Sequence, residues 1–372
     1  MRPLTRLWLA EPTRFAALRR APARRVLAFL ALLLIAAVLA AGIAPSPPPI
    51  GTDAETTADD RADLALYDGV VAAVAHGEDY YRSVVAAHRA GGYPLRPFVT
   101  VRLPTLAVVQ AALPPAVTLW LLWSLALVVI VAWWTRLAQL FRRRAPRLIA
   151  VALLAGGCVM LVQPELMTFH EPWAALLIAL SLAVRRPGRW VEAVALGLSA
   201  ALIRETALVY LLTMGALAWR DGERREALGW AGVVAMLALV LALHAHALAQ
   251  LTGPLDHESQ GWAGFGGFGF FVRAVAASSA LTLAPLPLAA LLVVLAMIGW
   301  ATWSDPLGVR VLAVLVGYAV VIALFARPDT FYWAFLVAPL VPLGLVFVPD
   351  AAADLVRRAL DRRRITVQIS RP

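Results

Sequence analysis

The sequence predicts an all-α, polytopic membrane protein with about ten transmembrane helices. Apolar residues make up 61% of the 372 residues, charged residues make up only 15%, and the mean hydropathy is +0.77. A soluble domain of this length needs more polar surface to cover its core. The apolar residues also occur in long runs that are separated by short arginine-rich or acidic stretches, which is typical of consecutive membrane spans.

The first predicted span covers residues 26–44 and follows a basic segment, 1–25, that contains seven arginines. A cleaved signal peptide is the alternative interpretation of this region. However, the basic segment is long for a signal, and Pro45 follows the small residues where cleavage would occur. We therefore interpret 26–44 as a signal anchor and 1–25 as a cytoplasmic N-terminus.

Nine further apolar runs predict the other spans of a transmembrane domain, 26–349, which precedes a basic tail, 350–372. These runs are 116–138, 148–162, 173–184, 190–203, 206–219, 228–248, 283–303, 309–326 and 332–348. Several are shorter than the ~20 residues that a span usually needs, so they must tilt little or lie where the bilayer is thin. The runs 190–203 and 206–219 also fit a single broken helix. The tryptophans near span ends, predicted to lie in the membrane interface, are Trp133, Trp134, Trp219, Trp300, Trp303 and Trp333.

The distribution of charge predicts the orientation in the membrane. All 33 basic residues are arginine, and 25 of them lie in the segments that face the cytoplasm if the N-terminus is cytoplasmic. The opposite loops contain eight arginines but 14 of the 23 acids. This asymmetry predicts a bacterial-type inner membrane protein with both termini in the cytoplasm. The net charge of +10 then reflects topology and attraction to anionic lipids, and not binding of nucleic acid.

Some enzyme classes are excluded by composition. Without lysine, the chain has neither a P-loop lysine nor a Schiff-base lysine, and the single cysteine, Cys158, excludes an intrachain disulfide or a cysteine-based metal site. His244 and His246 are two residues apart on a predicted helix and therefore face different sides, which argues against a shared metal. The glycine-rich run 261–269 lacks the context of a nucleotide loop, and we interpret it as an interfacial loop.

The first loop on the predicted extracytoplasmic side, 45–103, is the only long polar segment. Residues at helical spacing predict an amphipathic helix on the membrane surface, namely Asp63, Tyr67, Val70, Val71 and Val74. Asp59, Asp60 and Asp63 lie in the first turn of this helix. Carboxylates there either stabilise the helix dipole or take part in chemistry, and the spacing alone is compatible with both roles.

Ionisable residues also occur at other predicted extracytoplasmic helix ends. They are Glu171, Arg204, Glu205, His257, Glu258, Arg327 and Asp329. Ionisable groups at membrane depth are functional candidates, whereas hydrated groups in the headgroup layer need no function. For His257 and Glu258 we favour the hydrated interpretation.

Short motifs along most of the chain resemble the GT-C superfamily. They are the acidic first loop with its surface helix, Gly77-Glu-Asp-Tyr-Tyr81, Gly92-Tyr-Pro94, Arg102-Leu-Pro104, Glu171-Pro-Trp-Ala174, Ile203-Arg-Glu205 and Arg327-Pro-Asp-Thr-Phe-Tyr-Trp333. GT-C proteins are polytopic glycosyltransferases that use polyprenyl-phosphate sugars. The similarity is to their bacterial mannosyltransferase-like branches.

The resemblance implies an inverting transfer of a sugar, outside the cytoplasmic membrane, from a polyprenyl-phosphate donor to a glycan, lipid or protein acceptor. A first-loop carboxylate would take the proton of the acceptor hydroxyl. The candidates for this base are Asp60 and Asp63, with Asp59 behind them. Because this loop contains several acids where the family pattern has one isolated carboxylate, the identity of the base stays open.

The resemblance also implies residues that bind the donor. The charge that develops on the phosphate leaving group needs arginine or a divalent metal, and no other cofactor is implied. The arginine candidates are Arg102, Arg204 and Arg327, and Glu171 and Asp329 would orient the acceptor or these arginines.

Two other classes of membrane protein compete with a glycosyltransferase. A transporter or lipid flippase is expected to show an inverted repeat and charges near the middle of its spans, and the sequence shows neither. A non-catalytic scaffold would need acidic loops only for solubility. The positions of the charged residues in the folded chain discriminate between these classes, because an enzyme requires Asp60 or Asp63 to meet Arg204 and Arg327 around one cavity.

Overall fold

A computed structural model describes residues 7–48, 58–141 and 143–361, and for residues 58–63 it describes the backbone alone. Within this part of the chain every named element is an α-helix or a 3₁₀-helix (η), and extended pairing is limited to three isolated bridges. The predicted all-α class is therefore confirmed for the residues described.

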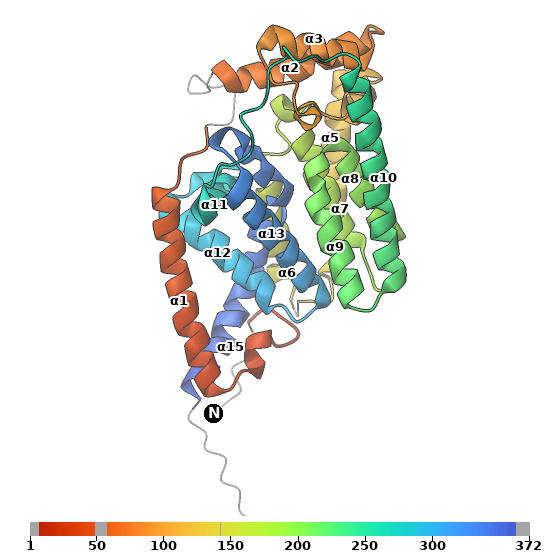
Figure 1. Cartoon of the computed structure of the whole chain (residues 1–372). Coiled ribbons are helices and arrows are strands. Elements are labelled where there is room, and N and C mark those ends of the chain that lie inside the picture. Colours follow the sequence, from red (N-terminus) through yellow and green to blue (C-terminus); the bar gives the residue numbers. More distant parts are fainter. Residues whose placement is uncertain (1–6, 49–57, 142, 362–372) are drawn as a thin grey trace, which may run out of the picture.

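Long helices lie side by side in a bundle, and two shorter helices of the first loop lie across one end (Figure 1). The first-loop helices are α2 (Ala58–Ala75) and α3 (Tyr80–Gly91), and the short helix α4 (Thr105–Ala111) follows the loop. The bundle contains α1 (Arg20–Ile43), α5 (Pro115–Arg136), α6 (Arg144–Cys158), α7 (His170–Val184), α8 (Val191–Ile203), α9 (Leu208–Arg220), α10 (Arg224–Ala249), α11 (Gly267–Ala277), α12 (Leu286–Thr302), α13 (Pro306–Phe325) and η6 (Pro328–Val337). The chain then continues through α14 (Leu340–Leu343) and η7 (Gly344–Phe347) into α15 (Val348–Leu360).

Four single helices, α1, α5, α10 and α13, are long and apolar enough to cross a membrane. A fifth candidate is the pair formed by Pro328–Val337 and Leu340–Leu360, which is bent by 49°. Shorter apolar helices, among them α7, α8, α11 and α12, complete the bundle. Several helices are thus compatible with a multi-pass membrane protein, and the total of about ten spans stays a prediction.

Contacts between distant segments define the two ends of the bundle. At one end Asp350 accepts hydrogen bonds of 2.8 Å from the backbone N–H groups of Leu7, Trp8 and Leu9, and the backbone N–H of Ala10 donates to the carbonyl of Leu140. We call this end the basic face. It contains the described parts of 7–25, 136–147, 185–190, 220–226, 303–310 and 348–361. The opposite end, which we call the acidic face, contains 58–104, 250–266 and 327–329.

The helices α8 and α9 form an antiparallel pair, which decides between the two interpretations of 190–219. Arg185, after α7, pairs with Glu226 at the start of α10, and the ring of Trp190 packs against Gly229 of α10. Both contacts place the beginning of α8 at the basic face. Since α9 is followed directly by α10, it returns to the same face, and the α8–α9 connection lies at the other end of the two helices.

The glycine-rich run differs from the predicted interfacial loop, because its last residues begin α11. Phe270 and Phe271 in this helix are fully buried. At Gly269 the backbone of α1 leaves no room for a Cβ atom, and at Gly264 the carbonyl of Ala326 does the same. The glycines therefore permit close packing between backbones.

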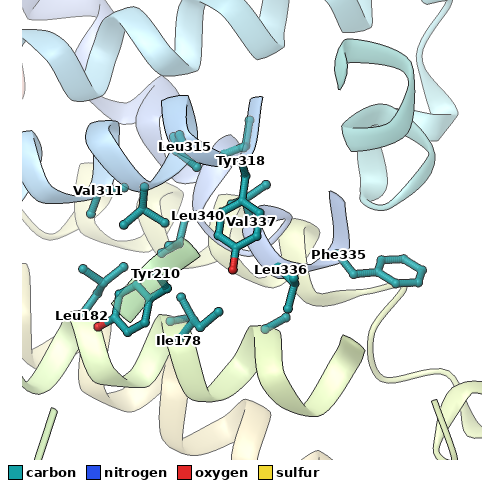
Figure 2. Packing of buried hydrophobic residues seen from close by; sticks show 14 of the residues in the cluster. Ile178, Leu182, Tyr210, Val311, Leu315, Tyr318, Phe335, Leu336, Val337 and Leu340 are labelled. Carbon is teal, nitrogen blue, oxygen red and sulfur yellow. The ribbon is translucent and has the colours of Figure 1, made fainter. Parts of the chain in front are cut away.

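Side chains from α7, α9, α13 and η6 meet in the main core, as shown by Ile178, Tyr210, Leu315 and Leu336 in Figure 2. The prediction of interfacial tryptophans is wrong for most of these residues. Trp133 and Trp300 are fully buried and donate to the carbonyls of Ala179 and Leu340, Trp303 and Trp333 are also buried, and Trp219 is exposed. Aromatic rings with an N–H donor are thus used to link helices within the protein.

Candidate functional site

Four charged side chains from three distant parts of the chain meet at the ends of α7 and α8 that lie toward the acidic face. Arg204 Nε lies 2.5 Å from Glu171 Oε1, and Arg204 Nη1 pairs with Glu205. Arg102 Nη2 lies 3.8 Å from Glu171 Oε1, and its Nη1 lies 3.6 Å from Glu205 Oε1. We call these four residues the charged cluster.

The charged cluster is formally neutral, and all of its members are buried except Glu205, which is partly exposed. Glu171 and Arg204 have exposed fractions of 1% and 2%, and Arg102 has 8%. Removing a charge from water is costly unless an opposite charge compensates it, and two arginines here face two glutamates. Local structure supports the arrangement, because Glu171 lies in the first turn of α7, where the helix dipole favours a negative charge.

The charged cluster lies well below the acidic-face end of α10. The Arg185–Glu226 pair fixes the end of α7 and the start of α10 at one level. Figure 1 shows α7, α9 and α10 nearly parallel. At ~1.5 Å per residue, Glu171 lies about 21 Å above that level and Ala249 about 35 Å above it. The cluster is therefore recessed by about 14 Å, at membrane depth if α10 spans the bilayer.

Several buried polar atoms around the charged cluster have no hydrogen-bond partner. Among the described residues they are Arg102 Nε, both ring nitrogens of His170, Thr168 Oγ1 and Thr206 Oγ1. The His170 ring is only 3% exposed and contacts the ring of Tyr67 edge-on at 5.2 Å. An unpaired buried polar group costs about 1–3 kcal/mol, so such groups normally bind water or a ligand. A concentration of them at one place indicates a site for a polar partner.

The first-loop helices position Arg102 through its backbone. Tyr80 in α3 donates a 2.7 Å hydrogen bond to the Arg102 carbonyl, and His244 Nε2 in α10 lies 3.1 Å from the carbonyl of Val101. On the buried side of α3, burial and the nearby positive charge of Arg102 together lower the pKa of His88 to about 4, whereas the hydrogen bond to the Pro94 carbonyl opposes this shift. The loop is thus packed as a small core of its own above the charged cluster.

Aromatic rings connect the charged cluster to α2 and η6. Phe169 contacts the rings of Tyr67 and Tyr332 edge-on, at 5.7 and 5.4 Å. Tyr332 in turn lies 6.0 Å from the guanidinium carbon of Arg204. Asp63 lies one helical turn before Tyr67 in α2. The side chains of Asp59, Asp60 and Asp63, the predicted bases, lie outside the described part of the structure.

The structure brings three of the predicted substrate-binding residues together and leaves two apart. Arg102, Glu171 and Arg204 belong to the charged cluster. Arg327 and Asp329 instead pair with each other, with distances of 3.0 Å from Nε to Oδ1 and 2.5 Å from Nη2 to Oδ2. Arg327 also donates a 2.7 Å hydrogen bond to the carbonyl of Gly261. The motif 327–333 therefore reaches the cluster through Tyr332 and not through its charged residues.

Glu205, an ionisable candidate from the sequence without an assigned role, is part of the charged cluster, and Tyr67, His170 and Tyr332 lie beside the cluster without having been assigned a role. For Glu205 and His170 a signal was present, since each is adjacent to a predicted site residue. Among the residues whose side chains are described, no three His, Cys, Asp or Glu groups lie close enough together to hold a metal ion. The cluster is thus assembled from arginine, glutamate and aromatic side chains.

Comparison with known proteins does not identify the chain. No protein-family model, no curated protein and no solved structure matches it. The function of the charged cluster is therefore inferred from its geometry and from the motifs that form it.

Proposed function

We propose that the protein is a membrane glycosyltransferase that moves a sugar from a polyprenyl-phosphate donor to a glycan, lipid or protein acceptor at the acidic face. One observation carries the proposal. Three short motifs that resemble the GT-C superfamily, around Arg102, Glu171 and Arg204, are far apart in the sequence and converge in one buried, recessed cluster. A merely accidental set of short motifs has no reason to meet at one place.

Arg102 and Arg204 would bind the phosphate of the donor. A guanidinium group presents several N–H donors in one plane and matches the oxygen atoms of a phosphate. Arg102 Nε is buried without a hydrogen-bond partner among the described residues, so Arg102 retains a donor, whereas Arg204 Nε faces the Glu171 carboxylate. Glu171 and Glu205 hold the two guanidinium groups in place. A recessed site suits a lipid-linked donor, because the phosphate can remain near membrane depth while the sugar reaches the acceptor.

In the proposed reaction, a first-loop carboxylate takes the proton of the acceptor hydroxyl. The hydroxyl oxygen forms a bond to the anomeric carbon on the side opposite the phosphate. The bond between that carbon and the phosphate oxygen breaks, and the electron pair leaves with the polyprenyl phosphate. The base is Asp60 or Asp63, with Asp59 behind them. The arginines of the charged cluster stabilise the departing phosphate.

The orientation in the membrane is part of this proposal. The basic face would lie in the cytoplasm of a bacterial-type cell, with both termini, and the acidic face would lie outside the inner membrane. The donor, the acceptor and membrane lipids are then the expected partners.

The proposal is tested by transfer from radiolabelled polyprenyl-phosphate sugars in membranes that contain the wild type, Asp60→Asn, Asp63→Asn or Glu171→Gln. We expect losses of roughly 100-fold or more for Glu171→Gln and for one aspartate variant. Glu226→Gln is the matched control, because Glu226 is as buried as Glu171 but pairs with Arg185 at the other face. Its activity per folded molecule should stay near that of the wild type. Full activity in Glu171→Gln would contradict the proposal.

A transporter or lipid flippase is the alternative, and the recessed charges give it specific support. A buried cluster with a free guanidinium donor on Arg102 would also bind the phosphate of a lipid that is moved across the bilayer. Proteoliposomes with a fluorescent polyprenyl phosphate and a membrane-impermeant quencher separate the two functions. Movement of the lipid without any sugar transfer would favour the flippase.

A further inference from the structure

A second group of arginines lines a cavity at the basic face. This cavity, of about 390 Å³, lies between the ends of α7 and α9, the start of α13 and the short helix η1 (Arg14–Ala17). Its charged lining consists of Arg14, Arg185, Arg220, Asp221, Glu223 and Arg310. The length of α9, about 20 Å at ~1.5 Å per residue, separates it from the charged cluster. Its volume is within the roughly 300–1,000 Å³ of small-molecule sites.

The inner wall of the cavity contains two buried arginines. Arg185 uses Nε and Nη2 to bind Glu226, which leaves Nη1 outside that pair. Arg310 is 1% exposed and donates from Nη2 to Asp221 at 2.8 Å, but its Nε is buried and has no hydrogen-bond partner. An unpartnered N–H on a buried guanidinium is costly. Arg310 lines the cavity, so a ligand bound there would lie beside this guanidinium group.

The rim of the cavity contains two exposed arginines. Arg14 donates one hydrogen bond of 3.3 Å to the Ala301 carbonyl and forms no ion pair with any described residue. Its position is nevertheless fixed, because the backbone N–H and the hydroxyl of Thr13 both donate to Asp354, at 3.1 and 2.9 Å. Arg220 shares the carboxylate of Asp221 with Arg310.

The charges around the cavity leave a positive surplus. The four arginines face the carboxylates of Asp221 and Glu223 in the lining and of Glu226 behind it. One positive charge is therefore uncompensated, and Arg14 is the arginine without an ionic partner. Guanidinium groups in such an arrangement favour the oxygen atoms of a phosphate. If the basic face is cytoplasmic, it also adjoins the leaflet that is rich in anionic headgroups.

We propose that this cavity is a phosphate-binding site, which takes either the headgroup of an anionic lipid or a soluble phosphate ester at the basic face. The site is separate from the charged cluster, and the proposal does not depend on glycosyl transfer. The buried arginines would supply the specific contacts, and Arg14 and Arg220 would close around the ligand from the rim.

The test uses the purified full chain and two phosphate sources. In detergent, the thermal midpoint is measured while inorganic phosphate replaces chloride at constant ionic strength. In phosphatidylcholine nanodiscs with a fraction of phosphatidylglycerol, retained lipid is counted by native mass spectrometry. The variant Arg14→Ala/Arg220→Ala removes the rim. The matched control Arg189→Ala/Arg225→Ala removes two exposed arginines of the same face that do not line the cavity. Arg310→Lys keeps the charge near Asp221 but removes the Nε donor.

We expect the rim variant and Arg310→Lys to weaken binding roughly tenfold, as the loss of one charged hydrogen bond does, and the control to bind like the wild type. Binding of phosphatidylglycerol without binding of inorganic phosphate would support a lipid headgroup. Binding of inorganic phosphate, with or without the lipid, would support a soluble ester. Binding of neither would overturn the proposal, as would an equal loss in the control and the rim variant.

Discussion

At the basic face, Arg185 and Glu226 meet through two hydrogen bonds of 3.1 and 2.5 Å, and Trp230 donates a third at 3.2 Å to the same carboxylate. In the charged cluster, toward the acidic face, Arg204 contacts both glutamates closely, but Arg102 lies 3.6 and 3.8 Å from them, and its Nε has no hydrogen-bond partner among the described residues. Both regions are buried. A fully matched pair links helices, whereas a loosely held arginine such as Arg102 retains donors for another molecule.

The largest expected effect is on the matched pair. Glu226→Ala leaves the Arg185 charge buried and uncompensated, so we expect the free energy of unfolding to fall by about 3–5 kcal/mol. Reversible unfolding in mixed micelles measures this change. The double variant Arg185→Met/Glu226→Leu should recover much of the loss, because it removes both charges. A loss below about 1 kcal/mol in Glu226→Ala would show that the pair does not link the helices as described.

The next effect distinguishes the two ends by pH. His88 is neutral in the folded protein down to a pKa of about 4, whereas in the unfolded chain it takes up a proton near pH 6.5. The unfolded state therefore binds more protons than the folded state below pH 6.5. The stability that depends on a neutral His88 is fully present above pH 6.5 and is lost as the pH falls toward 4. The loss reaches about 3 kcal/mol at pH 4. Hydrogen-exchange protection of the α3 amides measures this loss as a function of pH. In His88→Gln this protection should depend less on pH.

A smaller effect is expected when a glutamate of the charged cluster is replaced. Glu171→Gln should lower the free energy of unfolding by about 1–3 kcal/mol, which is less than the loss in Glu226→Ala, because glutamine keeps the side-chain volume and one acceptor oxygen for Arg204. Unfolding in the same micelles allows a direct comparison. If the two losses are equal, the cluster is a structural link like the pair at the basic face.

The smallest expected effect concerns the contact between α3 and α10. The Tyr81 hydroxyl lies 3.2 Å from His244 Nδ1, so Tyr81→Phe removes one hydrogen bond near Arg102. We expect a loss of about 0.5–1.5 kcal/mol. Local hydrogen exchange in 80–91 is the measurement, with Tyr93→Phe in the same layer as a comparison. An unchanged exchange rate would show that the Tyr81–His244 contact does not stabilise the first loop.

Much of the fold was predictable because its signals are local. The apolar runs predicted helices, and the spacing from Asp63 to Val74 predicted α2, which the structure shows at 58–75. The number of membrane spans was harder to predict from the sequence, because α7, α8 and α11 are short and are supported by neighbouring helices. Even α11 was missed, since its glycines resemble loop residues until Gly269 is seen against α1.

The candidate site was predictable only in part. Arg102, Glu171 and Arg204 stood out because charges next to apolar runs are unusual. Arg327 and Asp329 met the same criterion, yet they pair with each other away from the cluster. Hydropathy places a residue at a helix end but carries no information about which helix ends are neighbours.

The sequence by itself determined the helical class, the presence of long apolar helices and the asymmetry between an arginine-rich and an acidic side. These properties depend on composition and on periodicity within single segments. Only the tertiary structure decided that Arg102, Glu171, Arg204 and Glu205 meet, and that Arg14 and Arg310 line one cavity. Such contacts join residues that are many positions apart, and they exist only because helix packing brings the ends of α7, α8, α9 and α13 together.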